Sequence, residues 1–256
     1  MATKIRSQLS KELLGQAFTD DLCSFEKRIE YQNIAAAYSK IENSIAVLSD
    51  LKENKSYIYC GSVAERIGIG NKGDIKQVNS IWEEELFSKI HPDDLIQKYL
   101  LELQFFYFLQ SIPVNERSDY YITSEMRILE NAKDYAIIHH RMFYIHSCPS
   151  GNLWLALCLY NNSCKQGESA NFNGLILNSS TGNVVNIDQR KYKNILSQRE
   201  KEILCLVDNG KMSKEIAEML SISLYTVNRH RQNILEKLRV KNSHEASRVA
   251  KLMNLI

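Results

Sequence analysis

Three side chains that could read the base sequence of DNA lie close together in the last third of the chain. Asn228, Arg229 and Gln232 fall in a segment whose apolar residues recur at helical spacing, so the three share the polar face of the expected helix. Amide and guanidinium groups form paired hydrogen bonds with purine edges in the major groove. The spacing therefore predicts that this face contacts bases.

Hydroxyl and cationic side chains around this segment could hold the DNA backbone. Contacts to phosphates set affinity and register without reading sequence. The predicted phosphate contacts are Lys214, Thr226, Arg231 and Lys237. The charge balance supports this chemistry, because residues 191–256 carry 13 Lys/Arg against 7 Asp/Glu, whereas the first 190 residues carry 19 against 23.

Four short helices are predicted to position these side chains. Ser197 and Glu200 have the spacing of a capping box, and Gly210 can end the first helix in a left-handed conformation. Ser213 and Ser223 are predicted to cap the second and third helices, and Ser243 is expected to begin the fourth. Only residues 221–223 join the second helix to the third, which is the layout of a helix-turn-helix.

A longer set of residues in this part of the chain goes beyond periodicity. It comprises Leu196-Ser197-Gln198-Arg199-Glu200, Gly210, Ser213-Lys214-Glu215-Ile216-Ala217, Thr226-Val227, His230, Lys237-Leu238 and Asn242. Over residues 196–255 it resembles the LuxR-type (GerE-like) DNA-binding domain of bacterial transcription regulators. The resemblance implies that the third helix enters the major groove with Asn228, Arg229 and Gln232 at the base-reading positions. It also implies that the fourth helix pairs two subunits through Ala246, Val249, Ala250 and Met253.

The sequence departs from that family at two positions. The family usually has Lys or a similar residue where Asn228 stands, so the recognised DNA sequence stays open. It has Gly where Arg239 stands, which implies a third helix that ends without a glycine cap. Region 4 of a sigma factor has a related pattern, but residues 229–235 follow the LuxR form and the preceding domain lacks aromatic-basic helices for promoter melting.

The first 190 residues combine strands and helices in the order of an α+β domain. Strands are expected at residues 45–48, 57–60, 120–129, 135–147, 153–160, 174–178 and 184–187. Helices are expected at residues 62–66, 79–89 and 93–110. This order matches the PAS fold, and Ile90-His91-Pro92-Asp93-Asp94 resembles the segment that precedes the long helix in many PAS domains.

An amphipathic helix is expected ahead of this domain, at residues 25–40. Its apolar residues recur at roughly helical spacing and are Phe25, Ile29, Ile34, Ala37 and Ile41. An apolar face of this length must be covered, either by its own domain or by a second copy of the chain.

One face of the strand at residues 120–129 could line a ligand pocket. Strand alternation directs this face toward whatever the sheet encloses, and its residues are Tyr120, Ile122, Ser124, Met126 and Ile128. On the next strand His140, His146 and Cys148 share one parity, but no carboxylate pattern supports a metal site. We therefore predict no metal, no identifiable cofactor and, at most, a small-molecule ligand of unknown identity.

Three other domain types are alternatives to the PAS fold for the first 190 residues. The autoinducer-binding domain of quorum-sensing LuxR proteins has a similar length and layout, but its spaced Trp, Tyr and Asp pattern is not found. A receiver domain is disfavoured because strands and helices do not alternate. A domain that only mediates protein–protein contacts stays open.

Composition and motifs disfavour other classes. The chain is 44% hydrophobic and 24% charged with a mean hydropathy of −0.31, as in soluble globular proteins. It shows neither a membrane span nor a signal peptide, and its six cysteines form no CxxC pair, which favours a cytoplasmic location. The sequence contains no nucleophile elbow, phosphate loop or HExxH motif, so we expect no enzyme.

These patterns together predict a helical segment at 1–42, a PAS-like sensor or dimerisation domain at 43–188, a linker at 189–195 and an all-α four-helix LuxR-type helix-turn-helix domain at 196–256. We expect a homodimeric transcription regulator that binds double-stranded DNA, with RNA polymerase as a further partner.

Overall fold

The computed structural model describes residues 2–18, 25–130, 134–148, 150–163, 174–185, 196–238, 240, 242–252 and 255–256. They belong to two compact units, Ala2–Ile187 and Asp188–Ile256. The predicted linker at 189–195 lies outside the described residues, and the predicted domain boundaries stay a prediction. None of the helices formed by the described residues has the length and apolar character needed to cross a bilayer.

In the described part of the N-terminal unit, eight strands form one antiparallel sheet. They are β1 (Ile45–Asp50), β2 (Lys55–Cys60), β3 (Ile75–Val78), β4 (Tyr120–Glu130), β5 (Asp134–Ser147), β6 (Leu153–Asn162), β7 (Leu175–Asn178) and β8 (Val184–Val185). Their order across the sheet is β3-β2-β1-β6-β5-β4-β7-β8. All of β1 and eight consecutive residues of β6 are buried, so the middle of the sheet is covered on both faces.

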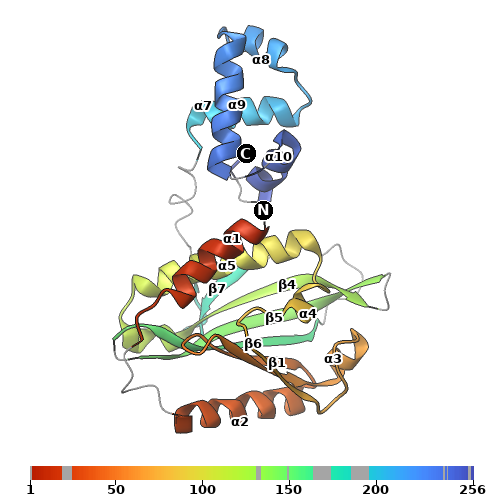
Figure 1. Cartoon of the computed structure of the whole chain (residues 1–256), viewed down its shortest axis with the longest axis vertical. Coiled ribbons are helices and arrows are strands. Elements are labelled where there is room, and N and C mark those ends of the chain that lie inside the picture. Colours follow the sequence, from red (N-terminus) through yellow and green to blue (C-terminus); the bar gives the residue numbers. More distant parts are fainter. Residues whose placement is uncertain are drawn as a thin grey trace. The chain divides into compact units, whose positions relative to one another are not determined.

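Helices provide this cover (Figure 1). On one face α1 (Ala2–Leu14) and α5 (Pro92–Gln110) pack together, and on the other α2 (Phe25–Glu42) packs against β1, β2 and β6. The short helices α3 (Ser62–Arg66) and α4 (Glu84–Phe87) and a 3₁₀ turn at Val114–Asp119 connect the strands. The helical segment predicted at 1–42 therefore forms part of the cover of the sheet.

Most expected elements of this unit are present. The strands expected at 120–129, 135–147 and 153–160 are β4, β5 and β6, and α3 has the expected bounds. Helix α5 begins with Pro92, and the His91 imidazole accepts a hydrogen bond from the Asp93 N–H at 3.3 Å. Local sequence patterns therefore predicted the positions of these strands and helices.

The segment between β2 and α5 differs from the expectation. Residues 75–78 form β3 at the edge of the sheet beside β2, and the helix expected at 79–89 is confined to α4. The N–H groups of Ile81 and Trp82 donate to the side chains of Asn54 and Ser80, each at 3.0 Å. Side-chain acceptors thus replace the helical hydrogen bonds that the prediction assumed.

A β-bulge in β5 corrects the parity assumed for its histidines. Register shifts flank His146, so this residue and His140 do not share a face. His140 lies beside Tyr160 in the layer under α5, whereas His146 packs against the Tyr31 ring of α2 at 5.9 Å and Cys148 belongs to the core beneath α2. Among the described residues, no group of three or more His, Cys, Asp or Glu side chains could hold a metal ion.

The described part of the C-terminal unit is a bundle of four helices around its own core. The helices are α7 (Gln198–Asp208), α8 (Ser213–Met219), α9 (Leu224–Leu238) and α10 (Ser243–Leu252). The capping box is confirmed, since Ser197 Oγ accepts the Glu200 N–H at 3.3 Å and the Glu200 carboxylate accepts the Ser197 N–H at 2.7 Å. Ser223 caps α9 by accepting the Thr226 N–H at 3.0 Å.

One predicted N-cap is wrong. Met212 is the N-cap of α8 in place of Ser213. Helix α10 begins at Ser243 as expected, and the Asn242 side chain accepts a backbone N–H of its first turn at 2.9 Å. The hydroxyls of Ser213 and Ser243 accept hydrogen bonds from the Arg231 guanidinium at 2.7 and 2.9 Å. Arg231 therefore ties the first turns of α8 and α10 to α9.

Candidate functional site

Helix α9 presents the predicted base-contacting side chains to solvent. Its buried residues face the core of the unit and are Val227, Ile234 and Leu238. Asn228, Arg229 and Gln232 are exposed, and the Gln232 amide donates to the Glu236 carboxylate at 3.0 Å. The predicted polar face is confirmed, and its contact with bases stays a prediction.

The turn before α9 fixes the direction in which this helix leaves α8. Ser221 adopts a left-handed conformation with a φ of 51°, and Ile222 packs against the core of the unit. Arg199 of α7 donates to the Leu220 carbonyl at 3.0 Å. Helix α7 and the core therefore hold the turn, so α8 and α9 have a defined helix-turn-helix geometry.

The predicted phosphate contacts have different surroundings. Lys214 is exposed, and the Thr226 hydroxyl lies 2.8 Å from the hydroxyl of the α9 N-cap. Arg231 makes the two internal hydrogen bonds described above, and Lys237 donates to the Glu200 carboxylate at 2.7 Å. Burial raises the pKa of Glu200, but the hydrogen bonds from Lys237 and the capping box outweigh it and lower this pKa overall. Arg231 and Lys237 thus stabilise the fold of the C-terminal unit through these contacts, a role that the sequence analysis missed.

Helix α10 does not present the two alanines that were predicted to contact a second subunit. Ala246 and Ala250 are 0% exposed and form part of the core of this unit. Methyl groups that already fill a core cannot also pack against a partner, so their predicted role is corrected to core packing. The side chain of Val249 and the whole of Met253 lie outside the part of the chain that the structure describes.

In the N-terminal unit, the predicted pocket residues of β4 point into the domain. Ile122, Ser124, Met126 and Ile128 are at most 2% exposed, and Tyr120 is half-buried against an aromatic ring of α5. The apolar members pack in the core between the sheet and α5. Their inward direction is as expected, while a role in ligand binding stays a prediction.

Polar residues that the sequence analysis missed lie in the same layer. Lys98 and Glu102, one turn apart in α5, form an ion pair although their side chains are only 3% and 5% exposed. The buried Glu83 carboxylate accepts hydrogen bonds from Ser56 at 2.6 Å and from Ser49 at 3.4 Å. The available signal was a Lys–Glu pair in an otherwise apolar helix, but this spacing is also typical of a solvated helix face.

The buried Glu83 carboxyl predicts a pH dependence of stability. Burial raises its pKa to about 7, and the Ser56 hydrogen bond offsets only part of this effect. In the unfolded chain the same group titrates near 4.5. Between these values the folded state holds the proton more tightly, so Glu83 is expected to remove about 3 kcal/mol of stability as the pH rises from 4.5 to 7.

Substitution of Glu83 by glutamine isolates this contribution. The amide keeps an acceptor for Ser56 and cannot ionise, so we expect the variant to lose less stability than the wild type over the same pH range. Urea unfolding followed by tryptophan fluorescence reports on this unit, because both tryptophans, Trp82 and Trp154, lie in it. Equal pH slopes for the two proteins would contradict the assignment.

Comparison with known proteins identifies the family of the C-terminal unit. Residues 194–250 match the family model described as bacterial regulatory proteins, luxR family. The transcriptional regulatory protein DesR of Bacillus subtilis (strain 168) is 57% identical over 53 residues, which cover 21% of this chain and 27% of DesR. The sequence match thus extends across the helix-turn-helix described above.

A second relative reaches beyond this unit. The transcriptional activator protein EchR of Dickeya chrysanthemi is 31% identical over 163 residues, which cover 56% of this chain and 65% of EchR. That share is larger than the C-terminal unit, so the alignment extends into the N-terminal unit. The solved structure of a phage VqmA–DPO complex aligns over 87% of this chain and 89% of its own, with 14% identity and a TM-score of 0.30. The C-terminal unit of the chain is therefore a LuxR-type (GerE) helix-turn-helix domain, and LuxR-family transcription regulators are among the chain's relatives.

Proposed function

We propose that this chain is a sequence-specific, homodimeric regulator of transcription that binds double-stranded DNA through α9 and is modulated by its N-terminal unit. The observation that carries the proposal is the exposed face of Asn228, Arg229 and Gln232 on α9, the second helix of the helix-turn-helix in a LuxR-type domain. These side chains match the hydrogen-bonding pattern of purine edges. Two copies of α9 would read the two halves of a palindromic site.

Selection from a random pool of DNA duplexes tests this function. The full chain is incubated with the pool, and the bound duplexes are sequenced after several rounds. We expect enrichment of a twofold-symmetric sequence whose half-sites lie about one helical turn, or a multiple of it, apart. Retention of duplexes without any enriched sequence would contradict the proposal, because non-specific phosphate binding alone would explain it.

The order of the central strands of the N-terminal unit, β2-β1-β6-β5-β4, supports a PAS-like sensor domain, as does the packing of α5 over these strands. The alternatives are an autoinducer-binding unit and a unit that only contacts proteins. The alignment to EchR, a transcriptional activator, extends into this unit, so the likeness to transcription regulators is not confined to the DNA-binding domain. The outward face of α2 favours a role in assembly.

The apolar face predicted at residues 25–40 points away from the sheet. Ala35 and Ser39 are the buried residues of α2, whereas Phe25 and Ile41 are 67% and 80% exposed. The other exposed hydrophobic side chains of this helix are Ile29, Ile34 and Tyr38. The face therefore does not cover its own domain, and we assign it to a second copy of the chain.

An antiparallel pair of α2 helices fits this face. It places Ile34 close to the twofold axis, with the exposed Ala37 and Ile41 on the same side of the helix. The same arrangement brings the exposed Glu26 of each copy near the exposed Lys40 of its partner. The charges at the two ends of the helix are thus complementary across the proposed contact.

Substitution of Ile34 by glutamate is expected to separate the dimer. Two carboxylates then meet near the axis and two apolar contacts are lost, so we expect the dissociation constant to rise about 100-fold or more. Sedimentation equilibrium of the full chain measures this constant. Ile75→Glu in β3 is the matched control, since Ile75 is an exposed isoleucine outside α2. An equal effect of the two substitutions would refute the assignment.

A further inference from the structure

Tyr225, the second residue of α9, exposes an aromatic ring to solvent. It is 75% exposed, more than any other large hydrophobic residue in the described part of the C-terminal unit. No hydrogen bond or ring contact joins Tyr225 to another described residue. Single apolar residues are common on protein surfaces, so exposure alone assigns no role. The place of Tyr225 on the helix does.

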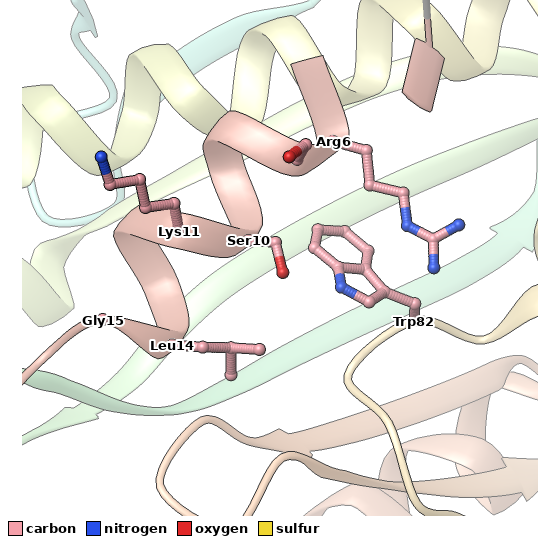
Figure 2. A pocket seen from close by; sticks show the side chains of 7 residues that line it. Arg6, Ser10, Lys11, Leu14, Gly15 and Trp82 are labelled. Atoms are coloured by element: carbon pink, nitrogen blue, oxygen red, sulfur yellow. The ribbon is translucent and has the colours of Figure 1, made fainter. Parts of the chain in front are cut away.

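A ring at a surface groove of the N-terminal unit shows the contrast. In the groove beside α1, the Arg6 guanidinium lies over the Trp82 ring, 4.9 Å from its centroid (Figure 2). Trp82 is only 8% exposed. Neither a cation nor another ring of the described residues packs against Tyr225. Most of the surface of its ring therefore stays available for a contact outside the chain.

Tyr225 lies at the centre of the face of α9 that carries the predicted base contacts. At about 100° per residue, Gln232 lies almost in line with Tyr225 along the helix. Asn228 and Arg229 follow Tyr225 by one turn, on either side of that line. The buried Ile234 points the opposite way. The Tyr225 ring therefore belongs to the same exposed stripe as the three side chains that are proposed to contact bases.

The position of Tyr225 near the start of α9 favours a base over the DNA backbone. In helix-turn-helix proteins the N-terminal residues of the recognition helix contact base edges. Thr226, the predicted phosphate contact, lies about 100° round the helix from Tyr225, with its hydroxyl beside that of the N-cap Ser223. Thr226 is thus at the side of the stripe, and Tyr225 faces the floor of the groove.

The chemistry of a tyrosine ring selects the kind of base. A phenol cannot form the paired hydrogen bonds by which amide and guanidinium groups identify a purine. Its ring can make an apolar contact, and the C5-methyl group of thymine is the apolar group that a base pair presents in the major groove. Both groups face water before binding, so their contact removes apolar surface from water.

We propose that Tyr225 recognises one thymine in each half-site of the DNA through contact between its ring and the C5-methyl group. The inference rests on the proposed DNA-binding function and deepens it, because it adds a specificity-determining residue and names the base. This thymine lies beside the base pairs that Asn228 and Arg229 contact, since one turn of helix separates Tyr225 from these residues.

Replacement of thymine by uracil removes this methyl group and leaves base pairing unchanged. Duplexes of the enriched sequence carry uracil at one symmetric pair of thymine positions at a time, and fluorescence anisotropy measures binding of the full chain. At one such pair we expect the affinity to fall about fourfold for each half-site, and so about 15-fold for the dimer. Enriched half-sites without thymine, or equal affinity for every uracil duplex, would overturn the proposal.

Variants of Tyr225 connect this loss to its ring. We expect Tyr225→Ala to bind the thymine and uracil duplexes equally, with wild-type affinity for a scrambled duplex as evidence that the variant is folded. Tyr225→Phe keeps the ring and should keep the preference for thymine. Tyr135→Ala, which removes an exposed tyrosine of β5, is the control and should also keep it. A Tyr225→Ala variant that still prefers thymine, or a Tyr225→Phe variant that does not, would refute the methyl contact.

Failure of this inference differs from failure of the proposed function. An enriched palindrome that binds equally with thymine and with uracil refutes the Tyr225 contact alone and leaves the assignment of Asn228, Arg229 and Gln232 standing. Retention of duplexes without an enriched sequence refutes the sequence-specific function and this inference with it.

Discussion

Substitution of Glu102 by leucine is expected to lower the free energy of unfolding of the N-terminal unit by about 3–5 kcal/mol. Burial lowers the pKa of Lys98, but the Glu102 carboxylate raises it above its ordinary value, so the pair is held as two ions. Without Glu102 the ammonium must lose its proton or draw in water, and both cost free energy. The Phe87 and Tyr99 rings, 4.7 and 5.9 Å from Lys98 Nζ, compensate only in part.

The double variant separates the ion pair from the space that it fills. When Lys98→Met accompanies Glu102→Leu, no charge remains buried, and we expect a stability equal to or above that of the wild type. Glu85→Gln is the control, because the Lys76–Glu85 pair is exposed and its loss should cost far less. Denaturant unfolding followed by tryptophan fluorescence compares the variants. A double variant less stable than Glu102→Leu would contradict this argument.

If the double variant is at least as stable as the wild type, the ion pair weakens the fold relative to apolar residues of similar volume.

Local sequence signals located the helices of the C-terminal unit but not all of their caps. The capping box at Ser197 and the cap at Ser223 depend on residues three positions away, so the spacing was sufficient to predict them. Ser213 and Ser243 have the same local appearance, yet both hydroxyls bind Arg231, which lies 18 and 12 positions away. Such partners are fixed by the packing of α8 and α10 against α9, which spacing does not reveal.

In the N-terminal unit, too, the sequence pattern did not show what each face of a helix or strand contacts. Periodicity predicted an apolar side of α2, but it could not show that Phe25, Ile29 and Ile41 are exposed rather than packed against the sheet. Strand alternation gave the inward face of β4, whereas a bulge turned His146 away from the face of His140. A pattern shows which residues share a face, and only the fold shows what that face meets.

Substitution of Arg229 by alanine is expected to reduce specific DNA binding strongly. A guanidinium that makes a paired hydrogen bond with a base contributes about 1–3 kcal/mol of discrimination in each half-site. A dimer on a palindrome loses this contribution twice, so we expect its affinity for the selected duplex to fall by about 30-fold to 10⁴-fold. Fluorescence anisotropy with the selected duplex measures the loss.

The comparison with non-specific DNA decides what kind of contact Arg229 makes. If Arg229 reads a base, a scrambled duplex should bind the variant and the wild type with similar affinity, and preference at one base pair of each half-site should relax. If it binds phosphate instead, both duplexes lose affinity equally and the slope of log affinity against log salt falls by about one per half-site. Lys251→Ala, which removes the same charge from an exposed position of α10, is the control. Because Arg229 is exposed and the core of α9 is formed by other residues, an unfolded variant is not expected, and unchanged affinity for the selected duplex would show that the base-contact assignment is wrong.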